Sequence, residues 1–143
     1  MSLRLLLLLN FAAAAYLTGL IWTVQVVHYP SFGQVPKAGW AAFHAAHTRR
    51  MSYVVLVPMV VELALAIWLA WVGRKVLPGG TAWWSLGLVW LIWAATFFIS
   101  VPFHNRLAQG YDYVAIDGLI RTNWLRTLAW TARAVLLGWL LAR

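Results

Sequence analysis

The sequence predicts an all-α, four-span, up-down helical bundle that is embedded in a membrane. Of the 143 residues, 64% are hydrophobic and 10% are charged, whereas soluble domains carry about 25% charged residues. The mean hydropathy is +0.78. Four apolar stretches are each long enough to cross a bilayer, which takes about 20 residues. A water-soluble core of this size cannot bury so much apolar surface, so we expect lipid to be the solvent.

The four spans form a single domain, residues 1–143. The first span is too long for the apolar region of a secretory signal, about 7–15 residues, and we expect it to be retained. An amphipathic helix start, at about 38–49, precedes the second span. The spans are predicted at about 3–27, 50–72, 82–102 and 119–141.

Prolines and glycines mark the expected breaks. Proline disfavours helix at the residue before it, so Pro30 and Pro36 are expected to bracket a short loop. Pro102 is expected to bend or end the third helix just before His104. The segment 78–80, Pro-Gly-Gly, predicts a turn. Residues 105–118 are expected to form the longest loop.

Charge and cysteine content exclude several classes of function. The net charge of +8 arises because only three acidic residues accompany eleven basic ones. We expect the basic residues to lie against anionic headgroups. A nucleic-acid site would need a dense patch of basic residues, and the sequence has none, so we expect no nucleic-acid partner. The chain has no cysteine, which excludes disulfides, thiol redox chemistry and iron–sulfur ligation.

An up-down topology places both termini and the 73–81 connection on one side of the membrane. A raw count of Lys and Arg favours the opposite side as cytoplasmic. However, several of those arginines are candidate site residues, and a short N-terminus with Arg4 usually stays inside. We therefore expect both termini in the cytoplasm, at a bacterial inner membrane.

The same topology brings all four histidines to the opposite side. His44 and His47 are three residues apart and share one helix face. His28 and His104 end the first and third spans. Neutral imidazole binds Cu, Fe, Zn or haem, so a site for Cu, Fe or haem is one hypothesis. The absence of cysteine argues against structural zinc. The alternative is that these histidines only hydrogen-bond loop carbonyls and headgroups.

Two arginines of the fourth span lie on one helix face, because Asn123, Arg126, Trp130 and Arg133 recur at steps of three and four residues. A guanidinium group suits a carboxylate, a phosphate or a quinone-like carbonyl. We expect Arg126, with Asn123, to face the site rather than to snorkel towards headgroups.

Glu62 lies in the middle of the second span, where an ionised side chain costs at least about 2.5–3.5 kcal/mol unless it is paired or protonated. Arg133 lies at a similar depth, about 15–20 Å from the histidine side. A buried Glu62–Arg133 ion pair is therefore predicted, with a structural role.

The segments VQVVHYPSF, FHAAHTRRMSYVVLVPMVVEL and NWLRTLAWTAR resemble a family of small bacterial four-helix integral-membrane proteins. That family is in turn distantly similar to the anthrone-oxygenase-like membrane proteins. The resemblance implies a four-helix bundle with an interfacial polar site. The residues that map to this site are His28, His44, His47, His104, Asn123 and Arg126. The oxygenase link implies an apolar aromatic substrate taken from the bilayer.

Two classes of function follow. The first is an oxidoreductase or oxygenase-like enzyme that acts on an apolar, carbonyl-bearing substrate from the bilayer, with histidines as metal ligands or acid/base groups. The second is a non-catalytic membrane protein: an assembly factor, a lipid or small-ligand binding module, or a transporter subunit. The sequence leaves the oligomeric state open, since neither Gly19 nor Gly87 forms a GxxxG motif.

Overall fold

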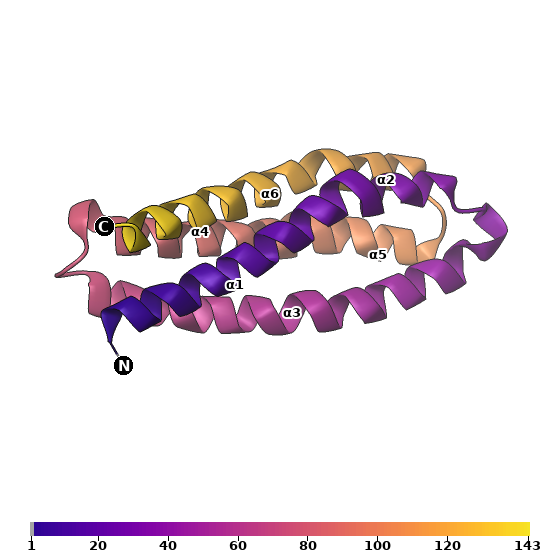
Figure 1. Cartoon of the computed structure of the whole chain (residues 1–143). Coiled ribbons are helices and arrows are strands. Elements are labelled where there is room, and N and C mark those ends of the chain that lie inside the picture. Colours follow the sequence, from indigo (N-terminus) through magenta and orange to yellow (C-terminus); the bar gives the residue numbers. More distant parts are fainter. Residues whose placement is uncertain (1) are drawn as a thin grey trace.

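The computed structural model describes residues 2–143, and the regular structure of this part of the chain is helical (Figure 1). The first helical stretch joins α1, Leu3–Thr23, to a π-helical turn, η1, Val24–His28. It continues through α2, Tyr29–Ser31, and the 3₁₀ turn η2, Phe32–Gln34.

The second and third stretches meet at a tight turn. A 3₁₀ turn, η3, Lys37–Gly39, leads into α3, Trp40–Gly73. The predicted Pro-Gly-Gly turn is confirmed as η4, Pro78–Gly80, in which Gly79 and Gly80 have φ of 58° and 70°. These left-handed conformations favour glycine. The third stretch consists of α4, Thr81–Ala95, the π-helical turn η5, Thr96–Ser100, and α5, Val101–Gln109.

The last helix, α6, spans Tyr113–Leu141. The four stretches pack as a ring in which α1 and α4 each contact both α3 and α6. Figure 1 shows both termini and the η4 turn at one end of the bundle, with the other two connections at the opposite end. The predicted up-down order of helices is therefore confirmed.

The distribution of side chains is compatible with that of a membrane protein. Polar residues such as Asn10 and Asn123 are buried, while large apolar side chains such as Val57 and Phe98 are exposed. Three stretches are long and apolar enough to cross a membrane: Leu3–Gln34, Lys37–Gly73 and Pro78–Gln109. The α6 helix, which carries two buried arginines, is not among them.

Pro30 lies within a helix, contrary to the predicted loop border, and the third stretch remains helical past Pro102 to Gln109. A π-helical turn ends two residues before each of these prolines, and each turn is closed by an N–H that bonds the carbonyl five residues back. Tyr29 N–H bonds to the Val24 carbonyl, and Val101 N–H bonds to the Thr96 carbonyl. In an α-helix the proline ring clashes with the carbonyl of the residue four positions back. The wider π-helical turn relieves this clash, so the chain remains helical at Pro30 and Pro102.

The expected loop at 105–118 is also wrong, since only residues 110–112 separate α5 from α6. The Asp112 side chain caps α6 by accepting from Ala115 N–H at 3.0 Å, and Arg106 binds its other oxygen at 2.6 Å. The Ala115 bond and the Arg106 pair together hold the pKa of this carboxyl below its usual range. Asp112 is thus a helix N-cap rather than a mid-loop residue.

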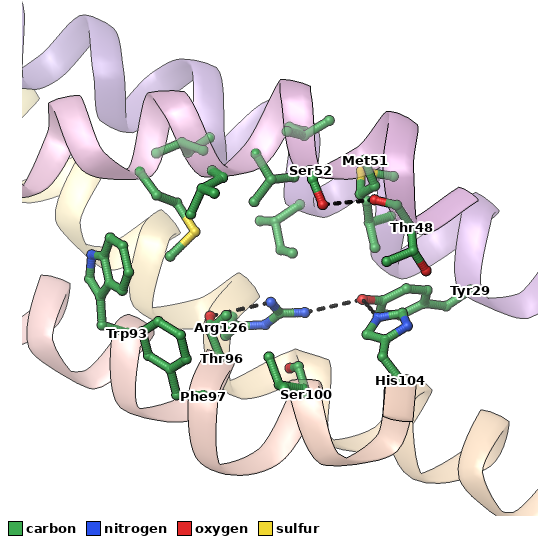
Figure 2. A pocket seen from close by; sticks show the side chains of 18 of the residues that line it. Tyr29, Thr48, Met51, Ser52, Trp93, Thr96, Phe97, Ser100, His104 and Arg126 are labelled. Atoms are coloured by element: carbon green, nitrogen blue, oxygen red, sulfur yellow. Dashed lines mark hydrogen bonds between the residues drawn. The ribbon is translucent and has the colours of Figure 1, made fainter. Parts of the chain in front are cut away.

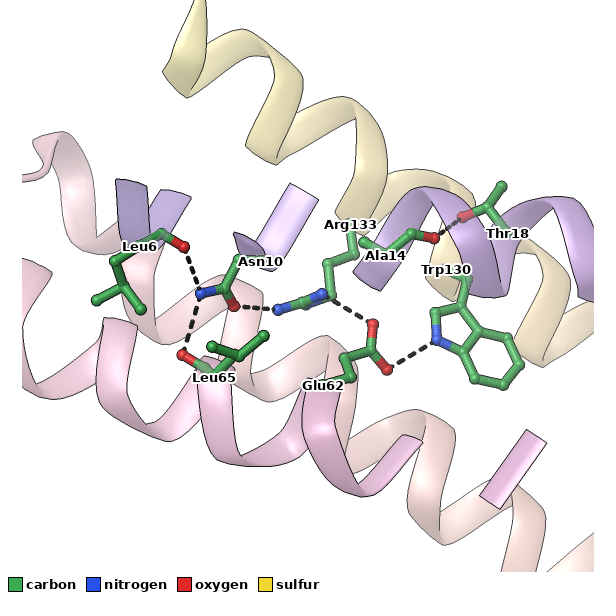
Figure 3. A network of polar contacts seen from close by, with 8 residues as sticks. All are labelled: Leu6, Asn10, Ala14, Thr18, Glu62, Leu65, Trp130 and Arg133. Atoms are coloured by element: carbon green, nitrogen blue, oxygen red, sulfur yellow. Dashed lines mark hydrogen bonds and ion pairs between the residues drawn. The ribbon is translucent and has the colours of Figure 1, made fainter. Parts of the chain in front are cut away.

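The predicted Glu62–Arg133 ion pair is confirmed, with 2.8 Å between Arg133 Nη1 and Glu62 Oε1 and both side chains fully buried (Figure 3). Trp130 Nε1 donates to Glu62 Oε2 at 2.9 Å, and Arg133 Nη2 donates to Asn10 Oδ1 at 2.7 Å. Asn10 in turn donates to carbonyls of Leu6 and Leu65. This network, which we call the ion-pair network, ties α1, α3 and α6 together.

Candidate functional site

A cavity of about 280 Å³ lies in the half of the bundle that holds the histidines, close to the smaller end of the about 300–1,000 Å³ of small-molecule sites. Its walls come from α1, α3, the α4–η5–α5 stretch and α6. Most of the lining is apolar, and two flexible methionines contribute to it. The apolar lining includes Leu17, Leu20, Ile21, Met51, Val55, Met59, Trp93 and Trp130. We call this space the bundle cavity.

The rim of the bundle cavity faces the apolar exterior of the bundle. Leu56 from α3, Phe97 from η5 and Val101 from α5 line the cavity and are 51%, 53% and 37% exposed. Exposed apolar side chains of this kind are stable where lipid, not water, covers them. The cavity is therefore bordered by exposed apolar side chains of α3, η5 and α5.

The polar end of the bundle cavity is formed by three side chains from three different helices (Figure 2). The Tyr29 hydroxyl lies 3.2 Å from His104 Nε2 and accepts from Arg126 Nη2 at 3.3 Å. Both π-helical turns help to build this contact, because Tyr29 follows η1 and His104 lies shortly after η5. π-helical turns are frequent at functional sites, where they change the direction in which side chains point.

Neutral groups hold Arg126 in place. Its guanidinium donates to Thr96 Oγ1 at 3.4 Å and to Asn123 Oδ1, in addition to Tyr29. Asn123 itself donates to Gln25 Oε1 at 2.9 Å, and Gln25 donates to the Ile120 carbonyl at 3.0 Å. Asn123 thus positions Arg126, while Arg126 lines the cavity.

The four histidines form two hydrogen-bonded pairs. His28 Nε2 lies 2.7 Å from His47 Nδ1, and His44 Nε2 lies 3.3 Å from His104 Nδ1. One ring of each pair must accept, so each pair contains a neutral imidazole. His104 uses both ring nitrogens, one towards His44 and one towards Tyr29. A hydrogen-bonded chain therefore runs from His44 through His104 to Tyr29.

Aromatic side chains cover the histidines at the end of the bundle. The Phe32 ring packs edge-on against His28 and His47, with centroids 5.4 and 4.9 Å apart. Trp40 stacks on His44 at 5.5 Å, and its indole N–H donates to the Leu107 carbonyl at 2.8 Å. Aromatic side chains therefore pack against three of the four histidines, His28, His44 and His47.

The same pairs bear on the metal hypothesis. Within residues 2–143, no group of three or more His, Asp or Glu side chains is placed to hold a metal ion. The histidine nitrogens point at one another instead, although the rings of His44, His47 and His104 lie only 5.6–6.1 Å apart. Binding of Cu, Fe or haem by the histidines stays a prediction, and we assign no step to such a group.

The predicted site residues lie in one region but have different surroundings. His47, His104 and Arg126 line the bundle cavity, whereas His28, His44 and Asn123 lie behind them and contact them. The sequence did not single out Tyr29, the residue at the centre of the polar end. An interfacial aromatic belt explains a tyrosine at this position equally well, so no sequence pattern distinguishes it.

Comparisons of the chain with protein-family models, with curated proteins and with solved structures gave no match. The function is therefore argued from the geometry of the site.

Proposed function

We propose that this is a four-span integral membrane protein that takes an apolar, carbonyl-bearing small molecule from the bilayer into the bundle cavity. In this proposal α6 is the fourth span, its two arginines are turned inward, and both termini face the cytoplasm of a bacterium. The observation that carries the proposal is the cavity itself, which has apolar walls, a rim of exposed apolar side chains and one polar end.

The polar end matches the chemistry of a carbonyl. Arg126 and the Tyr29 hydroxyl are donors that can hold a carbonyl oxygen, while the flexible Met51 and Met59 side chains adapt to the body of the ligand. A buried donor without an acceptor is costly, so a ligand with an acceptor is preferred over one without. Arg126 and Trp93 line the cavity, and each also has a fully buried N–H, Nε and Nε1, without an acceptor within residues 2–143.

Binding is tested with three matched aromatic probes: acetonaphthone, ethylnaphthalene and naphthoate. Equilibrium dialysis against purified protein in nonionic detergent gives the affinities. We expect acetonaphthone to bind more tightly than ethylnaphthalene, because only the ketone offers an acceptor to the polar end. Equal affinity of these two neutral probes would contradict the proposal.

The four-span topology is tested with single cysteines, which is straightforward because the chain has none of its own. Cysteines introduced at Gly79, Tyr111 and Arg143 lie in the η4 turn, in the connection before α6 and after the end of α6, so the last two flank α6. A membrane-impermeant thiol reagent added to intact cells should label the Tyr111 position and neither the Gly79 nor the Arg143 position. Labelling of Tyr111 and Arg143 together would contradict a membrane-spanning α6, and the reversed pattern would contradict cytoplasmic termini.

The chain from His44 through His104 to Tyr29 favours an enzyme over a passive binding module. His104 has one nitrogen on the Tyr29 hydroxyl and the other on His44, which is the arrangement of a general acid/base with a second imidazole behind it. Such a group can move a proton to or from a carbonyl bound at Tyr29. The test is exchange of the α-protons of acetonaphthone in heavy water, which we expect wild type to accelerate and Tyr29→Phe to abolish.

The redox part of the proposal, an oxidoreductase or oxygenase-like activity, needs a metal or a cofactor. Elemental analysis and an optical spectrum of protein purified without chelators, compared with the His44→Ala/His47→Ala variant, test it. Near-stoichiometric Cu, Fe or haem that is lost in the variant would support this activity. A metal-free and colourless wild-type protein would leave the histidines as acid/base groups.

A further inference from the structure

We infer that the ligand of the bundle cavity is an amphiphilic organic acid whose single carboxylate pairs with Arg126. The inference rests on the proposed binding function and narrows it from a carbonyl-bearing molecule to an anion. The inference is based on the arginine partners of the three acidic side chains.

Every acidic side chain of this protein is bound to an arginine other than Arg126. The sequence contains three acids. Glu62 pairs with Arg133 at 2.8 Å, Asp112 with Arg106 at 2.6 Å and Asp117 with Arg121 at 2.7 Å. None of these carboxylates lines the bundle cavity. Among residues 2–143, therefore, no side-chain anion remains for Arg126.

Arg126 is nevertheless buried, with 5% of its surface exposed. Its acceptors are the neutral oxygens of Tyr29, Thr96 and Asn123, and its Nε has no acceptor within the described residues. A guanidinium group stays charged in proteins, so desolvation cannot be relieved by loss of the proton. A buried cation of this kind is expected to meet an anion, and the cavity that it lines is the place from which an anion can come.

The surroundings of Arg126 select a monoanion with an apolar body. One carboxylate neutralises one guanidinium, whereas a phosphate dianion would leave a net negative charge in an apolar cavity. The planar fork of arginine matches the two oxygens of a carboxylate, and charge-assisted bonds of this type are about twice as strong as neutral ones. The remaining walls are apolar and suit an aromatic or aliphatic body.

The experiment compares matched probes that differ only in the polar group. The aromatic series is naphthoate, acetonaphthone and ethylnaphthalene, and the linear series is decanoate, methyl nonyl ketone and undecane. Affinities for purified wild-type protein are measured by equilibrium dialysis in nonionic detergent at neutral pH, where both acids are ionised. We expect the acid of at least one series to bind at least about tenfold more tightly than its ketone, consistent with a charge-assisted contact.

Three variants assign the effect. Arg126→Gln keeps hydrogen-bond donors but removes the charge, and its preference for acid over ketone should fall to below about threefold. Arg126→Lys keeps the charge and should retain part of the preference. Arg121→Gln is the control on the same helix, because Arg121 is exposed and pairs with Asp117 outside the cavity; it should bind like wild type. Circular dichroism melting shows whether each variant is folded.

The outcomes separate this inference from the proposed function. If acid and ketone bind wild type equally, while the hydrocarbon binds more weakly, the carboxylate inference is overturned and the proposed function stands. If the hydrocarbon binds as tightly as both, or if no probe binds, both are overturned. A preference for acid that persists in folded Arg126→Gln would overturn the role of Arg126. Tighter binding of decyl phosphate than of decanoate would overturn the choice of a carboxylate.

Discussion

Arg126 and Arg133 lie about two turns apart on α6, and both are buried, yet their surroundings differ in one respect. Each has an asparagine acceptor, Asn123 for Arg126 and Asn10 for Arg133. Each also has a buried Nε without an acceptor in the described chain. Only Arg133 has a carboxylate, Glu62. In the ion-pair network, the carboxylate of Glu62 balances the charge of Arg133. At the polar end of the bundle cavity, no carboxylate of residues 2–143 balances the charge of Arg126.

The difference separates a structural role from a binding role. A cation with its own carboxylate has no need of a ligand, so the ion-pair network fixes the register of α1, α3 and α6. A cation without one is expected to bind an anion from outside the chain. Trp130 connects the two regions, because its indole N–H donates to Glu62 while its side chain also lines the bundle cavity.

The largest effect is expected when the Glu62–Arg133 pair is broken. Glu62→Leu leaves Arg133 as a buried, unpaired charge, and Arg133→Met leaves Glu62 as one. Loss of one partner of a buried pair costs about 3–5 kcal/mol. We therefore expect either variant to lose about that much free energy of unfolding, measured by titration of detergent-solubilised protein with SDS.

The double variant Glu62→Leu/Arg133→Met is the control for this prediction. It removes both charges together, and replacement of a buried pair by apolar residues is often neutral or stabilising. It should therefore be more stable than either single variant. A double variant as unstable as the sum of the two singles would show that packing, not the charge pair, causes the loss.

Changes at the two asparagines are expected to have smaller effects on stability and to distinguish the regions by ligand affinity. Hydrogen bonds between membrane helices contribute about 0.6 kcal/mol on average and up to about 1.7 kcal/mol, so Asn10→Ala and Asn123→Ala should each lose about this much. Only Asn123→Ala should weaken binding of the acid probes, because Asn123 holds the guanidinium of Arg126. Dialysis with naphthoate measures this; equal weakening in Asn10→Ala would contradict separate roles.

The Glu62–Arg133 pair of the ion-pair network was predictable from the sequence, and its physical reason is simple. A charge in an apolar span is costly, so Glu62 had to find a cation at its own depth, and Arg133 was available. The gathering of the histidines at one end also followed from an up-down order of four apolar stretches. In both cases the argument needs only depth along the helices, which residue numbers give directly.

The contacts at the polar end of the bundle cavity depend on the direction in which each side chain leaves its helix axis. The sequence predicted these directions poorly. Proline rules assume α-helical geometry, and they predicted a loop border at Pro30 and a bend or an end at Pro102. The π-helical turns η1 and η5 instead carry the helices onward and change the face on which the next residues lie. The contact of Tyr29 with His104 and Arg126 follows from that change, which no spacing in the sequence indicates.

The smallest effect on stability is expected from Arg126→Met, although the same change at Arg133 is expected to be severe. Removal of Arg126 abolishes a buried charge that has no counter-ion and leaves no carboxylate unpaired. Tyr29 and Thr96 keep other partners, His104 and the Ile92 carbonyl. Asn123 Oδ1 loses its donor, but removal of the unpaired buried charge offsets that loss. The ligand-free variant should therefore stay within about 0.5 kcal/mol of wild type or become more stable.

Bound ligand should increase the difference in unfolding free energy between wild type and Arg126→Met. A ligand at about 100 times its Kd stabilises the folded state by about 2.7 kcal/mol, so excess naphthoate or decanoate should raise the unfolding free energy of wild type. Arg126→Met should show little of this gain, because it lacks the cation that binds the carboxylate. If ligand-free Arg126→Met instead loses about 3–5 kcal/mol, as Arg133→Met is expected to, Arg126 is a structural residue with a partner inside the bundle. Arg126 and Arg133 would then have the same structural role, and Arg126 would not be available to bind the carboxylate of a ligand.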